Sequence, residues 1–391
     1  MKLKRSVLAT LVAASLLGFD VAPVHALTVP TRFVSLSKAS VLNNPGIIVL
    51  DPKTNEIIYQ SNSEVTRAPA SVLKLVSTTS ALKTFGPDKT FTTSISLTDK
   101  KNKIVLVGDG DPWLTTSPAD AKRLKRAFLP GLINKALAEN PGLKAISLQY
   151  KNIYYQDIQA LQAFYKGRLK IYPHVLTDST EISAPIAQTV SPKLSSIIEY
   201  TLLWSDNLLA ARLSFMAAKA QGFTADSAGL QASFEKLFTE MKIPAAGLVV
   251  KDGAGLSHST RISARTIGEL LVAVKSDPSL QVIYEGLPLA GVSGTLRNRF
   301  TKDAPSAVGL VKAKTGWINS TVSLAGFVNV GEGDYVFAVI ADRLANKESI
   351  RQSARVAIDK MLATIAKPTP GVAPETVPLP APEATLTPSN G

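Results

Sequence analysis

The 391-residue sequence contains no cysteine and only three histidines. Disulfide bonds and thiolate zinc sites are therefore excluded. His174 and His258 have neither a metal-ligand spacing nor a plausible triad serine, and we interpret both as structural or surface residues. We expect no metal site and no cofactor.

Long apolar runs are also missing, which bears on how we interpret the first 26 residues. Lys2, Lys4 and Arg5 precede an apolar run at residues 7–19, and a small-residue cleavage pattern ends at Ala26. A membrane-spanning helix needs roughly 20 apolar residues, and this run is shorter, so we favour a cleaved signal over a membrane anchor. We predict a cleaved secretory signal and an exported protein, located in the cell wall or periplasmic space or secreted.

The formal net charge is +13. A basic exported protein favours anionic wall polymers or a membrane surface as a partner. The clusters Lys100-Lys101 and Lys122-Arg123-Lys125-Arg126 resemble a turn and a solvated helix face. Export also argues against nucleic acid, so we expect no nucleic-acid partner.

The order of predicted elements suggests one sheet built from both ends of the chain. Residues 46–60 predict a hairpin around the turn at 51–55, and residues 308–343 predict three more strands. A helix follows Pro69, residues 191–282 are mainly helical, and a last helix spans roughly 347–365. We expect an α/β (α+β) fold with an antiparallel sheet flanked by helices and a helical subdomain.

The remaining segments divide the chain further. We predict a signal at 1–26, a main domain at 27–90 and 181–366, and a smaller inserted α/β domain at 91–180. Residues 118–140 of the insert read as one helix. Residues 367–391 are Pro-rich without apolar periodicity and predict a disordered tail.

Ser71 and Lys74 stand three positions apart at the start of an apolar helical run. Side chains at i and i+3 share a helix face, so Lys74 can reach the serine oxygen. Burial lowers the pKa of a lysine, and a neutral lysine can take the proton of a serine nucleophile. The pattern alone is weak, since Ser35 and Lys38 repeat it.

Two further motifs follow in order: Ser205-Asp206-Asn207, and Lys314-Thr315-Gly316 on a predicted strand. These three motifs in this order resemble the active-site set of penicillin-binding proteins and serine β-lactamases. Four more segments sharpen the resemblance, namely VGDGDPWL (107–114), DGAGLS (252–257), LPLAGVSGTLRNRF (287–300) and AKTGWINSTVSLAGFV (313–328). Together they resemble the DacB-like D-alanyl-D-alanine carboxypeptidases/endopeptidases, the S13 peptidases.

That resemblance implies a β-lactamase/transpeptidase-like domain and an acyl-enzyme mechanism on peptidoglycan stem peptides, with β-lactam antibiotics as acylating inhibitors. Ser71 would be the nucleophile and Lys74 its base. Ser205 would relay a proton to the leaving amine, and Asn207 would bind the substrate backbone.

The third motif has its own implied roles. Lys314 would supply positive potential, and Thr315, Gly316 and Trp317 would be substrate-binding residues, with Thr315 on the terminal carboxylate. The backbone N–H groups of Ser71 and Trp317 would form the oxyanion hole.

The sequence departs from the family pattern at a few positions. Trp317 and Ile318 replace small or hydroxylic residues, Ala254 replaces a serine, and His258 replaces an arginine. Two alternatives stay open: a β-lactamase of the same fold, for which we find no deacylating glutamate, and a catalytically inactive wall-binding homologue.

Overall fold

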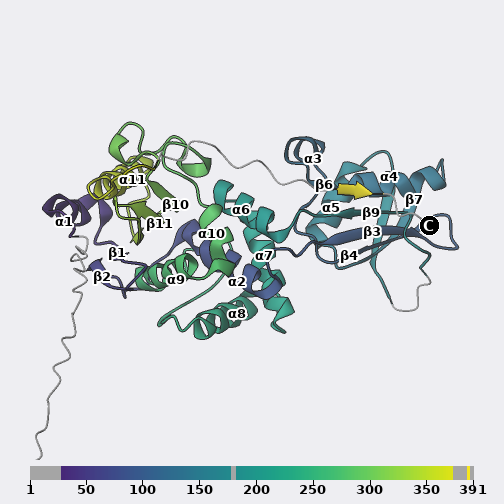
Figure 1. Cartoon of the computed structure of the whole chain (residues 1–391). Coiled ribbons are helices and arrows are strands. Elements are labelled where there is room, and N and C mark those ends of the chain that lie inside the picture. Colours follow the sequence, from purple (N-terminus) through teal and green to yellow (C-terminus); the bar gives the residue numbers. More distant parts are fainter. Residues whose placement is uncertain (1–27, 178–181, 373–384, 388–391) are drawn as a thin grey trace, which may run out of the picture.

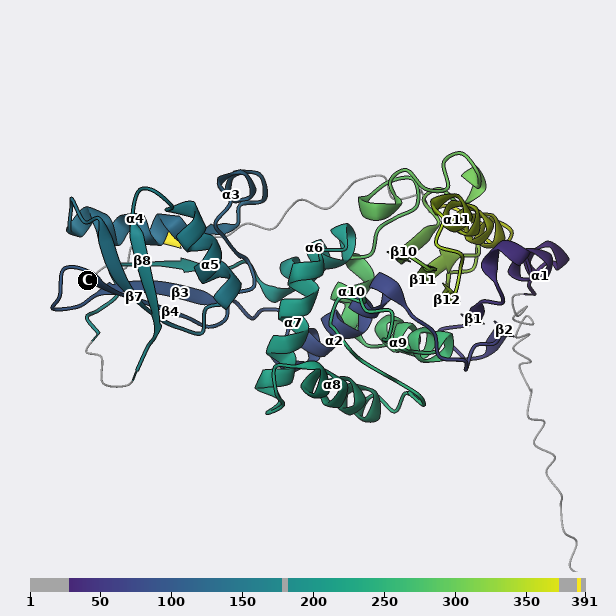
Figure 2. The same cartoon turned by 180° about the vertical axis from the view of Figure 1, so that it is seen from behind.

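The computed structural model describes residues 28–177, 182–372 and 385–387. The predicted signal at 1–26 and most of the predicted tail lie outside these residues. Two sheets lie at opposite ends of the molecule, with helices of the middle of the chain between them (Figures 1 and 2).

The first sheet has five antiparallel strands in the order β10-β11-β12-β1-β2. Their bounds are β1 Gly46–Leu50, β2 Ile57–Ser61, β10 Val311–Ile318, β11 Thr321–Asn329 and β12 Asp334–Ala341. Asp51 closes the predicted hairpin, because its Oδ1 accepts the Lys53 N–H at 2.8 Å and Asn55 takes a left-handed φ of 59°. N- and C-terminal segments thus share one sheet, which confirms the predicted fold class.

Helices cover both faces of this sheet. Alternate strand residues enter two different cores: Ala325 and Phe327 with Ile48 on one face, Val322 and Leu324 on the other. The core on the first face includes residues of α2 Lys74–Phe85, α6 Leu194–Trp204, α7 Asn207–Ala220, α8 Ser227–Glu240, α9 Ala264–Ser276 and α10 Gln281–Glu285, and α9 packs directly against β1, β11 and β12. On the second lie α1 Thr31–Ser37 and α11 Glu348–Ala363.

The second sheet has six strands in the order β13-β9-β3-β4-β7-β8. Their bounds are β3 Thr92–Leu97, β4 Lys103–Gly108, β7 Ala145–Lys151, β8 Lys170–Val175, β9 Ala187–Val190 and β13 Thr385–Thr387. The helices α4 Leu129–Glu139 and α5 Tyr155–Phe164 contribute to its separate apolar core. The paired strands β4, β7 and β8 run parallel, and the other pairs are antiparallel.

The structure differs from expectation in this region at three points. The prediction of one helix over 118–140 is wrong, because the chain forms two helices there, α3 Pro118–Leu124 and α4. Lys125 ends α3 with a left-handed φ of 51°. Between the two helices, the short strand β6 Ala127–Phe128 pairs with β5 Leu114–Thr115. The strand β9 lies beyond residue 180 yet pairs with β3. The strand β13 falls in the predicted tail and occupies the open edge of β9.

Buried polar and aromatic contacts join the second sheet to the helices. Arg212 of α7 forms a buried ion pair with Asp157 of α5 at 2.6 Å. Trp113, which follows β4, enters the core of the first face and lies edge-on to Tyr200 of α6. Asp111 holds this turn because its Oδ1 accepts the Trp113 N–H at 2.8 Å.

Among the described residues, we find no helix with the length and hydropathy needed to cross a membrane.

Candidate active site

Ser71 lies in a 3-10 turn, Ala70–Leu73, that leads directly into α2. Ala70 takes a left-handed φ of 50°, which costs a non-glycine residue backbone strain. Two glycines make room for this turn: a Cβ on Gly255 would lie 1.9 Å from the Ala70 carbonyl oxygen, and a Cβ on Gly316 would lie 3.1 Å from the Ala70 Cβ. The turn is therefore wedged between the 252–257 loop and β10.

Lys74, the first residue of α2, is fully buried and donates hydrogen bonds to three oxygens. Its Nζ lies 2.7 Å from Ser71 Oγ, 2.8 Å from Asn207 Oδ1 and 2.8 Å from the Ala254 carbonyl oxygen. Burial lowers the pKa of Lys74 to about 8, while Asp252 and Asp206 act in the opposite direction. About a tenth of the amine is thus neutral at pH 7, and this neutral form can serve as a base for Ser71.

Ser205 and Asn207 are oriented by the break between α6 and α7. Ser205 ends α6 in a left-handed conformation, with φ 58°. Asp206 caps α7 by accepting the Leu209 N–H at 2.9 Å, and so sets Asn207 as the first helical residue. The Ser-Asp-Asn motif thus presents two side chains to the site and uses the middle one to start a helix.

Lys314 of β10 meets Ser205 in a buried position. Its Nζ donates to Ser205 Oγ at 2.8 Å and to the Thr315 carbonyl oxygen at 2.8 Å. Burial, and then the positive charge of Lys74, hold the pKa of Lys314 well below its usual range. The charge of Lys74 therefore affects the protonation of Lys314, although each lysine contacts a different serine.

The outer edge of β10 faces the open site. The Ala313 N–H donates to the Pro288 carbonyl oxygen, on the side of β10 away from β11. N–H groups alternate in direction along a strand, so those of Thr315 and Trp317 point to the same edge. This direction is the one that an oxyanion-hole role for the Trp317 N–H requires.

The other predicted binding residues have specific neighbours. Thr315 Oγ1 lies 2.9 Å from Thr295 Oγ1. Trp317 is 39% exposed, and its ring carries the Arg351 guanidinium 5.3 Å from its centroid. A Cβ on Gly316 would lie 2.1 Å from Ser323 Oγ, so β10 can approach the Ser71 turn only with glycine there.

The sequence motifs did not identify two groups that help to position the site. Asp252 accepts four backbone N–H groups of its own loop, from Ala254, Gly255, Leu256 and Ser257, at 2.6–3.1 Å. An aspartate before Gly-Ala-Gly is a turn signal that could have indicated this. The second is the buried Arg67–Asp342 ion pair, at 2.7 Å, whose partners carry no common sequence pattern.

Both histidines assessed from the sequence are exposed. His258 Nδ1 lies 3.5 Å from Ser320 Oγ. In the described ranges, no group of three or more His, Asp or Glu side chains is arranged to hold a metal ion.

Comparison with known proteins gives consistent matches. The family model for the D-Ala-D-Ala carboxypeptidase 3 (S13) family matches residues 35–147 and 171–365. Carboxypeptidase DacB of Mycolicibacterium smegmatis is 25% identical over 402 residues, covering 87% of this chain and 85% of the relative.

Solved structures show the same fold. Penicillin binding protein 4 (dacB) from Haemophilus influenzae matches with a TM-score of 0.68 and 17% identity, covering 84% of this chain and 98% of that one. A penicillin G-acylated predatory endopeptidase from Bdellovibrio bacteriovorus matches with a TM-score of 0.62 and 16% identity, covering 88% and 99%. With the family model spanning most of both sheets and all three motifs, the chain belongs to the D-Ala-D-Ala carboxypeptidase 3 (S13) family.

Proposed function

We propose that this chain is an exported, penicillin-binding, serine-type D-Ala-D-Ala carboxypeptidase that acts on peptidoglycan stem peptides. The hydrogen bond between Lys74 Nζ and Ser71 Oγ, at 2.7 Å, is the observation that carries the proposal. Family membership supports the reaction class, and the leader-like sequence with the net charge of +13 supports work at an anionic wall.

Acylation begins with neutral Lys74 taking the Ser71 hydroxyl proton. The Ser71 oxygen then forms a bond to the carbonyl carbon of the penultimate D-alanine. The backbone N–H groups of Ser71 and Trp317 stabilise the resulting oxyanion, and removal of one such donor costs roughly 3 to 4 kcal/mol in other enzymes. Asn207 has a second task here, because its side-chain oxygen accepts from Lys74 while its amide N–H₂ is free to bind the peptide.

Collapse of the oxyanion breaks the C–N bond and releases the terminal D-alanine. By relay through Ser205, the leaving amine takes the proton that Lys74 accepted from Ser71, and Lys314 Nζ holds the Ser205 hydroxyl at 2.8 Å. Lys314 and Thr315 attract the terminal carboxylate, since buried positive charge and a hydroxyl donor favour it. Water then hydrolyses the Ser71 ester and regenerates the enzyme.

The same site suits endopeptidase cleavage of a D-alanine amide, the activity named for the Bdellovibrio relative. A β-lactamase instead needs a carboxylate that activates water against the acyl-enzyme. In the described part of the chain, the carboxylates that act on Lys74 are Asp206 and Asp252, and both are engaged by backbone N–H groups. This arrangement favours the peptidase.

The test is an intact-mass time course of the protein with benzylpenicillin, alongside Ser71→Ala. We expect a long-lived adduct on Ser71, none in the variant, and D-alanine release from a pentapeptide by the wild type only. Fleeting adducts with drug hydrolysis would indicate a β-lactamase. No adduct and no D-alanine release would indicate an inactive wall-binding homologue.

A further inference from the structure

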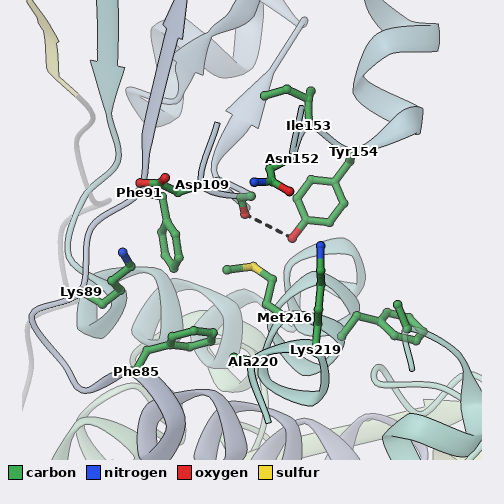
Figure 3. Close-up of a pocket in the computed structure, with 13 residues that line it drawn as sticks. Phe85, Lys89, Phe91, Asp109, Asn152, Ile153, Tyr154, Met216, Lys219 and Ala220 are labelled. Atoms are coloured by element: carbon green, nitrogen blue, oxygen red, sulfur yellow. Dashed lines mark hydrogen bonds between the residues drawn. The ribbon is translucent and has the colours of Figure 1, made fainter. Parts of the chain in front are cut away.

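A cavity of about 600 Å³ lies between the second sheet and the ends of α2 and α7 (Figure 3). The helices contribute Phe85, the last residue of α2, and Phe215 and Met216 near the end of α7 to its lining. Its upper wall comes from the loops after β4 and β7. This volume is within the range of small-molecule sites, about 300–1,000 Å³.

The interior is largely apolar. The rings of Phe85 and Phe91 meet edge to face, with centroids 6.2 Å apart. Ile153 adds an aliphatic side chain from the second-sheet side, and the thioether of Met216 lies between the two walls in Figure 3. Such a lining favours an apolar ligand body, because burial of apolar surface is the main gain on binding.

Two ammonium groups stand at opposite sides of this apolar interior (Figure 3). Lys89 Nζ lies 5.3 Å from the Phe91 centroid, and Lys219 occupies the last turn of α7. Neither lysine forms an ion pair with any residue in the ranges that the structure describes. The cavity's carboxylate, Asp109, lies on the Lys89 side, where its Oδ2 accepts the Thr92 N–H at 3.1 Å.

The charges are therefore asymmetric. Asp109 lies on the Lys89 side, whereas Lys219 faces Tyr154, whose hydroxyl donates to the Gly110 carbonyl oxygen and whose ring carries the Arg212 guanidinium 4.2 Å from its centroid. A ligand with an apolar body and one acidic group would place the acid at Lys219 and the body over the phenylalanines. We propose that this cavity is a binding site for an anionic amphiphile, a single-chain molecule of the fatty-acid type.

The site is separate from the catalytic centre and does not depend on the proposed function. The helix α2 begins at Lys74 and ends at Phe85, and α7 begins at Asn207 and ends at Ala220. Lys74 and Phe85 stand at the two ends of α2, and at 1.5 Å per residue the helix places the cavity about 16 Å from Lys74. Ligand binding and acylation of Ser71 can therefore be measured independently.

The experiment is calorimetric titration of the protein with sodium dodecanoate below its micelle concentration. We expect saturable binding at one site, and no binding of dodecyltrimethylammonium, which has the same chain and the opposite charge. Lys219→Gln should raise the Kd at least tenfold and Lys89→Gln less. Lys122→Gln, an exposed lysine on α3, is the matched control and should leave the Kd unchanged.

A second variant tests whether the ligand binds in this cavity, and it does so without changing a charged residue. Ala220 is exposed and lines the cavity, so Ala220→Trp should obstruct the cavity, abolish binding and leave the circular dichroism spectrum intact. Protein acylated at Ser71 by benzylpenicillin should bind dodecanoate as well as free protein does. Absence of dodecanoate binding, unchanged affinity in Ala220→Trp, equal effects of Lys219→Gln and Lys122→Gln, or loss of binding on acylation would each overturn the proposal.

Discussion

The side-chain oxygen of Asn207 lies 2.8 Å from the Nζ of Lys74, although 133 positions separate the two residues. Each is the first residue of its helix, so this contact ties the starts of α2 and α7 together. The neutral amide accepts from the ammonium without adding a negative charge. The residue type at 207 therefore affects the proton affinity of the Lys74 amine.

Replacing Asn207 by Asp should shift the pH dependence of acylation. A carboxylate beside Lys74 stabilises the ammonium and raises the lysine pKa from about 8. Below that pKa, each unit of increase reduces the neutral fraction about tenfold. We expect slower acylation by benzylpenicillin at pH 7, with recovery at higher pH.

The control for this prediction is Asn102→Asp, which adds the same charge at an exposed turn between β3 and β4. Acylation rate constants are measured from pH 6 to 10. The pH profile of Asn102→Asp should superpose on that of the wild type, and the profile of Asn207→Asp should not. An Asn207→Asp profile with an unshifted midpoint and a uniformly lower rate would show that Asn207 acts only through the substrate.

Lys74→Arg should nearly abolish acylation, because a guanidinium stays protonated and cannot accept the Ser71 proton. General-base catalysis is worth on the order of 10²–10⁴-fold, and we expect a loss in that range. In the wild type, the acylation rate should rise with pH through a midpoint near 8, as Lys74 loses its proton. Stopped-flow acylation measures both.

Lys83→Arg is the matched control, since Lys83 is exposed on the same helix. It should acylate at the wild-type rate. If Lys74→Arg acylates within a few-fold of this control, another group is the base.

The buried Arg67–Asp342 pair should contribute far more to stability than an exposed pair of the same length. Both Arg67–Asp342 and Lys193–Asp88 measure 2.7 Å, but their side chains are 6% and 4% exposed in the first pair and 63% and 78% in the second. Asp342→Asn leaves a buried guanidinium without its counter-charge, which costs about 3–5 kcal/mol. Asp88→Asn should cost under about 1 kcal/mol.

Urea unfolding of the two variants and the wild type gives the comparison directly. Asp342 also accepts the Ala68 N–H, next to the Ser71 turn, so Asp342→Asn should slow acylation as well. Equal unfolding midpoints for the two variants would contradict the assigned role of burial.

The sequence predicted the elements that depend on local chemistry. The hairpin at 46–60 follows from the Asp51–Asn55 turn, and the strand carrying Lys314 follows from alternating β-rich residues. The second sheet was harder, because β8 has an exposed, Pro-containing sequence and β9 is only four residues long. Neither has the apolar alternation by which a strand is recognised.

In the candidate site, too, contacts between residues close in sequence could be predicted, and contacts between distant residues could not. Ser71 and Lys74 are three residues apart, so their contact could be predicted from helix geometry. The Lys314–Ser205 contact joins residues 109 positions apart, and only the resemblance to a family indicated that they meet. Asp252 accepts backbone N–H groups of its own loop, a role that the turn signal of an aspartate before Gly-Ala-Gly indicates but that no active-site motif includes.

Gly316→Ala should damage both stability and acylation. The added Cβ would lie 2.1 Å from Ser323 Oγ and 2.9 Å from the Pro69 carbonyl oxygen, to which that hydroxyl donates at 2.6 Å. The strand β10 must then move away from the Ser71 turn, and overpacking of this kind costs about 1–3 kcal/mol. We expect a lower unfolding midpoint and slower acylation by benzylpenicillin.

Gly131→Ala is the control, because Gly131 lies within α4 and, outside the helix's own backbone, its added Cβ would meet only Phe128 Cδ1, at an ordinary contact distance of 3.6 Å. There alanine favours the helix, so stability should stay equal or rise by up to about 1 kcal/mol. Adding Ser323→Ala to Gly316→Ala removes the closest clash but not the one with Pro69, so it should recover only part of the acylation rate. Wild-type acylation by Gly316→Ala alone would mean that close approach of β10 to the Ser71 turn is not needed for the reaction.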